Sequence, residues 1–121
     1  MAKKILFIED EPDQVELIKA RLEASGYVFI SAMDGEEGVK KAIETRPDLV
    51  LLDLILPKLD GFEVCRRIKA DPKTKEIPVI ILTAIGKKNA EAECRMCGAD
   101  SFLKKPYDSA VLMAEIKKFI G

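Results

Sequence analysis

Charged side chains follow directly after short apolar runs at three places in this chain. Residues 49–52 lead into Asp53, residues 5–8 lead into Glu9 and Asp10, and residues 102–103 lead into Lys104 and Lys105. An ionised carboxylate is a costly neighbour for so much apolar surface unless a cation or a chemical role compensates it. If the three runs are parallel strands of one sheet, their charges meet at one edge, where they can act together.

The carboxylates of this group suit a hard cation. If the first and third runs are adjacent strands, Asp10 and Asp53 face each other at about 4.8 Å, with Glu9 close by. Two carboxylates about 4 Å apart repel by about 4 kcal/mol at an effective dielectric constant of about 20. Oxygen ligands of this kind favour Mg²⁺, with Mn²⁺ as an alternative, over zinc or copper.

A lysine and a threonine extend the group toward phosphoryl chemistry. Lys105 supplies an ammonium group, and Thr83, which follows the apolar run 79–82, supplies a hydroxyl donor. A carboxylate nucleophile suits a transferring phosphoryl group when a metal, an ammonium and a hydroxyl hold the phosphoryl oxygens. Taken singly, these residues could be a solvated loop, a helix N-cap, a strand end or a surface lysine pair. Their coincidence at strand ends favours a site.

The elements that must position these residues alternate regularly along the chain. Strand-like segments cover residues 4–9, 27–32, 49–53, 79–83 and 101–104, and helical spacing fills the stretches between them and residues 109–120. Five βα units predict an α/β fold, in which helices cover both faces of a parallel sheet. The third and fourth strands are apolar enough to be central, and the more polar fifth is expected at an edge. The residues alone leave the strand order open.

Local signals mark several helix ends. Pro12 stands where a first helical turn tolerates proline, and Gly26 is expected to end that helix. Asp34 is the expected N-cap of the second helix, which carries favourable charge pairs at 36–40 and 37–41. The third helix is expected to stop before residues 71–72, and the fourth to cover residues 88–97.

Length and composition indicate one domain, residues 1–121. Twenty basic residues against 21 acidic give a net charge of -1, so we expect no direct binding to nucleic acid or to a membrane surface. No apolar run approaches the about 20 residues of a membrane span, and the N-terminus lacks a signal-peptide core, so a cytoplasmic location is expected. Cys65, Cys94 and Cys97 are expected to be free thiols, because their count is odd and the chain has no histidine.

The whole chain resembles a response-regulator receiver domain, the phosphoacceptor module of two-component signalling. The matching segments are residues 8–11, Asp53, Pro57 with Gly61, residues 82–84, residues 98–100, and residues 105–106. The resemblance implies a flavodoxin-like, doubly wound sheet in the order 2-1-3-4-5, flanked by five helices. It also implies a phosphorylation-dependent switch, not an enzyme with an external substrate. A sensor histidine kinase or phosphotransfer protein would supply the phosphoryl group, and the domain would catalyse only its own phosphorylation and dephosphorylation.

The resemblance also implies roles for individual residues. Asp53 would be the phosphoacceptor, and Mg²⁺ would be bound by Glu9, Asp10, Asp53 and the backbone carbonyl of Ile55. Phosphoryl oxygens would be bound by Thr83, the backbone of Ala84 and Lys105. The switch would be formed by Thr83 and Phe102. The fourth helix, fifth strand and fifth helix would form the face that meets an unknown downstream partner or effector. The peptide bond before Pro106 would be cis.

Other protein classes share parts of this pattern. A haloacid-dehalogenase-like phosphatase would use Asp53 as its nucleophile, but such enzymes usually carry a second Asp two residues later, where this chain has Ile55. A flavodoxin-like nucleotide binder would need a phosphate-cradling loop, whereas residues 9–11 repel a phosphate unless a metal intervenes. A purely structural interaction domain would have no need for an acidic pocket with Lys105.

The resemblance leaves the kinase, the pathway and the output open. Since the sequence ends at Gly121, directly after the last expected helix, it is either a stand-alone regulator or a receiver from a longer protein. The resemblance also places two variable side chains beside the path by which water reaches the aspartyl phosphate, and in this chain they are Ile55 and Ile85. Both side chains are apolar and cannot orient a water molecule, so slow loss of the phosphoryl group is expected.

Overall fold

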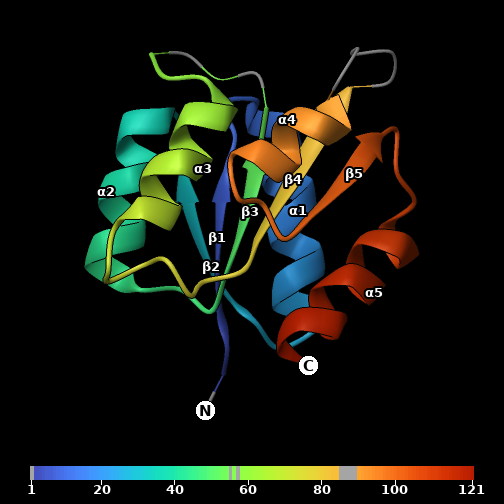
Figure 1. Ribbon diagram of the computed structural model, residues 1–121. Coiled ribbons are helices and arrows are strands. Elements are labelled where there is room, and N and C mark those ends of the chain that lie inside the picture. The colour runs from blue at the N-terminus through green and yellow to red at the C-terminus, as the bar shows by residue number, and fades with distance from the viewer. Residues whose placement is uncertain (1, 55, 57, 85–89) are drawn as a thin grey trace.

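Strands and helices alternate along the whole computed structural model, which describes residues 2–54, 56, 58–84 and 90–121 (Figure 1). The elements are β1 (Lys4–Ile8), α1 (Pro12–Ala24), β2 (Val28–Ala32), α2 (Gly35–Thr45), β3 (Leu49–Asp53), α3 (Gly61–Ala70), β4 (Val79–Ala84), α4 (Ala90–Met96), β5 (Ser101–Lys105) and α5 (Ser109–Ile120). Every strand begins and ends within one residue of its expected range. The expected start of the fourth helix at Lys88 lies outside the described residues.

The five strands form one parallel sheet in the order β2-β1-β3-β4-β5, and all the arrows in Figure 1 point toward the same edge. Ile8 pairs with Leu52 across β1 and β3, and Ala84 pairs with Lys105 across β4 and β5. β3 and β4 are therefore central and β5 is an edge strand, as their polarity predicted. This register brings the carboxyl ends of all five strands, and the residues that follow them, to one side of the domain.

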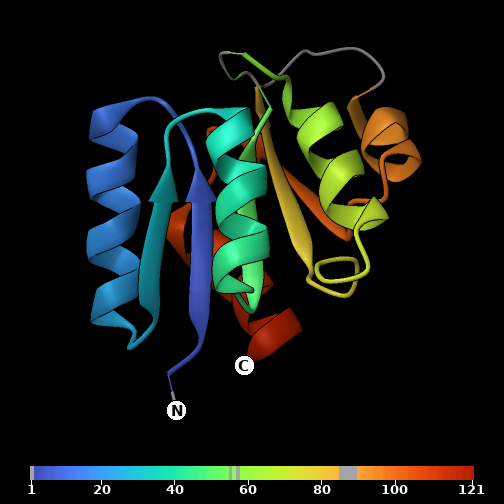
Figure 2. The same ribbon diagram turned by 90° about the vertical axis from the view of Figure 1, so that its left-hand side faces the viewer.

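Helices cover both faces of the sheet (Figure 2). Ile18 and Leu22 of α1 pack with Leu112 and Ile116 of α5 in one buried apolar cluster. The other face carries α2, α3 and α4, whose apolar side chains pack with a second cluster. Successive residues of β3 contribute to the two clusters in turn, because neighbouring side chains of a strand point to opposite faces. No helix in the described ranges is both long and apolar enough to cross a bilayer.

The start of α2 is fixed by two reciprocal hydrogen bonds. The Asp34 side chain accepts from the Glu37 backbone N–H at 2.9 Å, and Glu37 Oε1 accepts from the Met33 backbone N–H at 2.7 Å. The predicted N-cap is therefore confirmed, and the arrangement resembles a capping box whose second bond goes to the residue before the cap. The predicted pair between Glu37 and Lys41 is wrong, because Lys41 Nζ instead donates to the Ser31 carbonyl at 2.6 Å. Glu37 satisfies a backbone donor, which a solvated ion pair would leave open.

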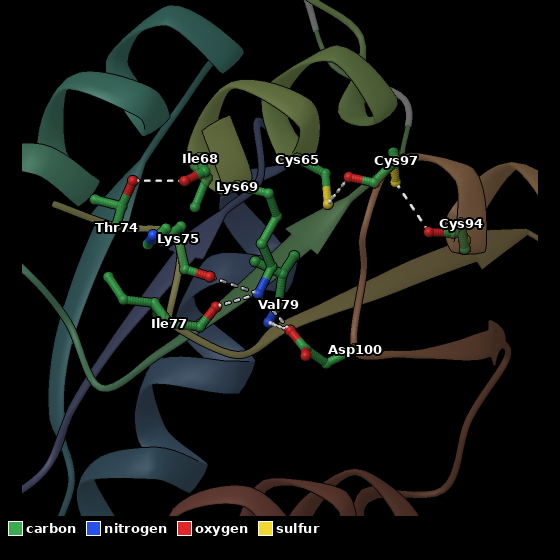
Figure 3. A network of polar contacts seen from close by, with 10 residues as sticks. All are labelled: Cys65, Ile68, Lys69, Thr74, Lys75, Ile77, Val79, Cys94, Cys97 and Asp100. Atoms are coloured by element: carbon green, nitrogen blue, oxygen red, sulfur yellow. Dashed lines mark hydrogen bonds and ion pairs between the residues drawn. The ribbon is translucent and has the colours of Figure 1, made fainter. Parts of the chain in front are cut away.

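None of the three cysteines forms a disulfide, as predicted, and the structure shows that all three are buried (Figure 3). The Cys65 thiol donates to the Cys97 carbonyl at 3.5 Å, and the Cys97 thiol donates to the Cys94 carbonyl at 3.2 Å. Burial, followed by the proximity of Cys97, raises the pKa of the Cys65 thiol. The raised pKa disfavours the Cys65 thiolate, which is the reactive form. All three side chains pack as small apolar groups between α3 and α4.

A polar network joins three segments at the amino ends of β4 and β5, on the side of the domain opposite the strand carboxyl ends (Figure 3). Lys69 Nζ, at the end of α3, donates to Asp100 Oδ2 and to the Ile77 carbonyl, both at 2.7 Å. Asp100 Oδ2 also accepts from the Val79 backbone N–H at 2.8 Å. The network therefore holds the end of α3, the start of β4 and the turn before β5 in one arrangement.

We expect Asp100→Ala to destabilise the fold by about 2 kcal/mol, because it leaves the Val79 N–H without its acceptor and removes the charged partner of the Lys69 ammonium, which keeps only backbone carbonyls. The control is Glu63→Gln, which weakens a partly exposed interaction with Arg66 and Arg67 on α3 and should cost about 0.5 kcal/mol or less. Urea unfolding monitored by circular dichroism measures both. Equal costs for the two variants would contradict the prediction.

Candidate functional site

Asp53 ends β3 as a buried carboxylate with one cationic partner. Its side chain accepts a hydrogen bond from Lys105 Nζ at 2.9 Å, and the same ammonium lies 3.5 Å from Glu9 Oε1. β4 separates β3 from β5 in the sheet, so the long lysine side chain reaches past the end of β4. Burial lowers the pKa of Lys105, but the hydrogen bond and charge of Asp53, with the charge of Glu9, leave it raised above its ordinary value.

Three carboxylates converge beside this lysine. Glu9, Asp10 and Asp53 each offer an oxygen within 4.8 Å of the others. Glu9 is only 2% exposed, and its Oε2 accepts from the Asp10 backbone N–H at 3.1 Å. Burial, followed by repulsion from Asp53, raises the pKa of Glu9 to about 7. Lys105 therefore does not offset the cost of the buried negative charge.

The cluster fits a divalent cation, which would favour the ionised form of Glu9 and relieve the repulsion. Within the described part of the chain it is the one group of at least three acidic or cysteine residues close enough to share a metal. Its oxygen ligands are those that Mg²⁺ prefers. Ile55, whose carbonyl is the expected further ligand, lies outside the described residues, as does Ile85. The expected slow loss of the phosphoryl group stays a prediction.

Thr83 is a buried donor with no partner in the described structure. It lies on β4 next to Asp53's strand, is 1% exposed, and its hydroxyl makes no hydrogen bond. An unsatisfied buried hydroxyl is costly, and a phosphoryl oxygen bound near Asp53 would satisfy it. Ala84 follows at the end of β4, opposite Lys105 in the register.

Phe102 lies on β5, where it is partly buried. It packs against the apolar cluster under α2, α3 and α4, and borders a cavity of about 260 Å³ with Cys94 and Ala99. The ring therefore faces α4 and lies on the strand that ends in Lys105. The Lys105–Pro106 peptide bond is cis, as the resemblance implied.

An open cavity of about 690 Å³ gives access to the acidic cluster. Glu9, Asp10, Asp53 and Lys105 line it together with residues that sequence analysis missed, notably Leu17 and Tyr107. Tyr107 could have been found, because it follows a strand end by two residues. Leu17 is half exposed and lies off the apolar face of α1, so its position in the cavity depends on where α1 packs.

A family model described as the response regulator receiver domain matches residues 5–117. The chain belongs to this family. This chain is 36% identical over 121 residues to the polar-differentiation response regulator DivK of Brucella anthropi, and the match covers 100% of this chain and 98% of that protein. It is also 40% identical over 117 residues to the transcriptional regulator RpaA of Synechocystis sp. PCC 6803, and that match covers 97% of this chain and 48% of that protein.

Solved receiver domains share the fold. The receiver domain of the sensor histidine kinase PA1611 from Pseudomonas aeruginosa superimposes with a TM-score of 0.91 at 33% identity, covering 100% of this chain and 99% of that one. That structure has a magnesium ion coordinated in its active-site cleft. This receiver domain is thus a phosphorylation-dependent signalling switch, and a haloacid-dehalogenase-like phosphatase is not supported. The chain spans about half the length of RpaA and 26% of PleD from Caulobacter vibrioides.

We expect Mg²⁺ to stabilise the receiver without any phosphoryl group, because a ligand that binds only the folded state raises stability by about 2.7 kcal/mol at a hundredfold excess over its dissociation constant. Asp10→Asn should reduce this gain by removing a charged ligand. Asp13→Asn, on the exposed first turn of α1, is the control. Thermal melts with and without excess Mg²⁺ measure the effect, and equal Mg²⁺ responses in wild type and Asp10→Asn would exclude the assigned cluster.

Proposed function

We propose that Asp53 is the phosphoacceptor of this receiver and takes its phosphoryl group from a phosphohistidine of a sensor histidine kinase or phosphotransfer protein. The observation that carries the proposal is a buried carboxylate, 8% exposed, that lies 2.9 Å from Lys105 and shares a metal-sized cluster with Glu9 and Asp10. Asp53 also opens onto the cavity, so a donor side chain can reach it.

In the proposed transfer, an Asp53 carboxylate oxygen attacks phosphorus as the P–N bond of the donor breaks. The imidazole leaves with the bond's electron pair and takes up a proton. Lys105, the Thr83 hydroxyl and the Ala84 backbone N–H hold phosphoryl oxygens. Mg²⁺, or Mn²⁺ in its place, would be held by Glu9, Asp10, Asp53 and the Ile55 carbonyl, and would supply charge that neutralises the phosphoryl oxygens. The same groups would hold the aspartyl phosphate while water hydrolyses it.

Incubation with acetyl phosphate and Mg²⁺ should add the mass of one phosphoryl group to the wild type and none to Asp53→Asn, because the amide lacks the nucleophilic oxygen. Asp48→Asn is a matched control. Asp48 lies just before β3, at the opposite end of the strand, where its side chain accepts from the Lys4 backbone N–H. Intact-protein mass spectrometry gives the result. Complete labelling of Asp53→Asn would reject Asp53 as the acceptor.

We further propose that Thr83 and Phe102 form the switch. A phosphoryl group would draw the unpartnered Thr83 hydroxyl toward it, and the Phe102 ring would move into the space that the side chain leaves. This would shift a pre-existing equilibrium between two arrangements of the α4–β5–α5 face, which would then meet an unknown downstream partner.

Phosphorylation should change the amide chemical shifts of Phe102 and of the α4–β5–α5 face. Thr83→Ala should lose most of this response while Asp53 is still labelled, because the hydroxyl that couples the phosphoryl group to the ring is gone. Thr83→Ser, which keeps the hydroxyl, is the matched control and should retain it. Shift changes confined to α1 and α2 in the phosphorylated wild type would reject the proposed switch.

A further inference from the structure

The first turn of α2 meets the end of the loop that follows Asp53. α2 and α3 lie side by side on one face of the sheet (Figure 1, Figure 2). A Cβ atom on Gly35 would lie 2.6 Å from the Leu59 carbonyl oxygen and 2.7 Å from Val64 Cγ2. The carbonyl belongs to the backbone and cannot rotate away as a side chain can. Glycine at position 35 is therefore what allows α2 and the loop to approach this closely.

α2 is held firmly enough that the loop would have to yield to an added methyl group. The capping box of Asp34 and Glu37 fixes its first turn, and Lys41 ties it to β2 through the Ser31 carbonyl. One turn further on, a Cβ on Gly38 would lie 2.5 Å from Ile8 Cδ1, so the helix already packs closely on β1. A clash at Gly35 would thus be relieved at Leu59.

The end of the loop is coupled in turn to the backbone of Asp53. The Gly61 N–H donates to the Leu54 carbonyl at 2.9 Å. A Cβ on Gly61 would lie 2.8 Å from both the Asp53 carbonyl oxygen and Leu54 Cα. Since one residue separates Leu59 from Gly61, a displacement of Leu59 would be felt at Gly61 and, through its hydrogen bond, at Leu54, the residue after the acceptor.

We propose that Gly35 is a positioning residue for Asp53: its missing side chain lets the first turn of α2 hold the loop, and through Gly61 the acceptor, in register with Glu9 and Asp10. The proposal rests on the proposed role of Asp53. An ion pair between Lys58 and Asp34 at 3.6 Å also joins the loop to α2. Its lysine is largely exposed, which makes the pair weak, so the backbone contact at Gly35 carries the effect.

The test compares Gly35→Ala with Gly26→Ala. Gly26 has a φ of +89° and no atom within 4 Å of an added Cβ, so its alanine variant strains the backbone without touching the loop. In the metal-free protein, Gly35→Ala should shift the amide resonances of Asp53 and Leu54, and Gly26→Ala should not. Gly35→Ala should also weaken Mg²⁺ binding, measured calorimetrically, by about tenfold, as loss of an outer-shell support of a metal ligand typically does. Gly26→Ala should bind Mg²⁺ as the wild type does.

Leu59→Ala is a second variant that loosens the end of the loop without a clash, because it keeps the carbonyl and Cβ that face Gly35 and removes the side-chain atoms that pack on the apolar cluster. It should move the same two amide resonances and weaken Mg²⁺ binding less than Gly35→Ala does. Unchanged Asp53 and Leu54 resonances and unchanged Mg²⁺ affinity in Leu59→Ala or in folded Gly35→Ala would overturn the role of Gly35. Failure of the wild type to accept a phosphoryl group would instead overturn the proposed function, because the metal-free resonances do not depend on phosphoryl transfer.

Discussion

The placement of Lys105 beside Asp53 is the constraint on which the chemistry of the site depends. It brings a cation from an edge strand beside a carboxylate at the end of a central strand, at 2.9 Å. Glu9, buried beside them, has a pKa raised to about 7, so the negative charge exceeds what one lysine can offset. The apolar sheet beneath the site has to hold these repelling groups together, because their mutual interactions do not.

The two ends of the sheet differ in how completely their polar groups are satisfied. At the amino ends of β4 and β5, the Lys69 ammonium and the Asp100 carboxylate are paired with each other and with backbone groups. At the carboxyl ends, the Thr83 hydroxyl has no partner in the described structure, and burial beside Asp53 disfavours the charged form of Glu9 and raises its pKa. The first end fixes the relative positions of α3, β4 and β5, and the second retains the polar groups that a cation or a phosphoryl group could satisfy.

The supports of the site come from helices as well as strands. Gly61 lets α3 begin against the backbone of Asp53, and Gly35 lets α2 begin against Leu59. Both are close backbone approaches that any side chain would prevent. Cys65 and Cys97 fill the space between α3 and α4 as buried side chains. Packing of this kind transmits small displacements, because a close-packed interior has little free volume to absorb them.

Sequence by itself determined the alternating elements, the α/β class and the residues that end each strand, because these depend on local periodicity and on the direction of parallel strands. Asp53, Glu9, Asp10 and Lys105 could be predicted from those strand ends. The strand order came from the family resemblance, since βα units of similar polarity can be arranged in more than one order. Only the tertiary structure decided that Glu9 is buried, that Thr83 lacks a partner, that Leu17 and Tyr107 line the cavity, and that Glu37 caps α2 instead of pairing with Lys41. Each of these depends on where elements distant in the sequence pack, which local periodicity does not specify.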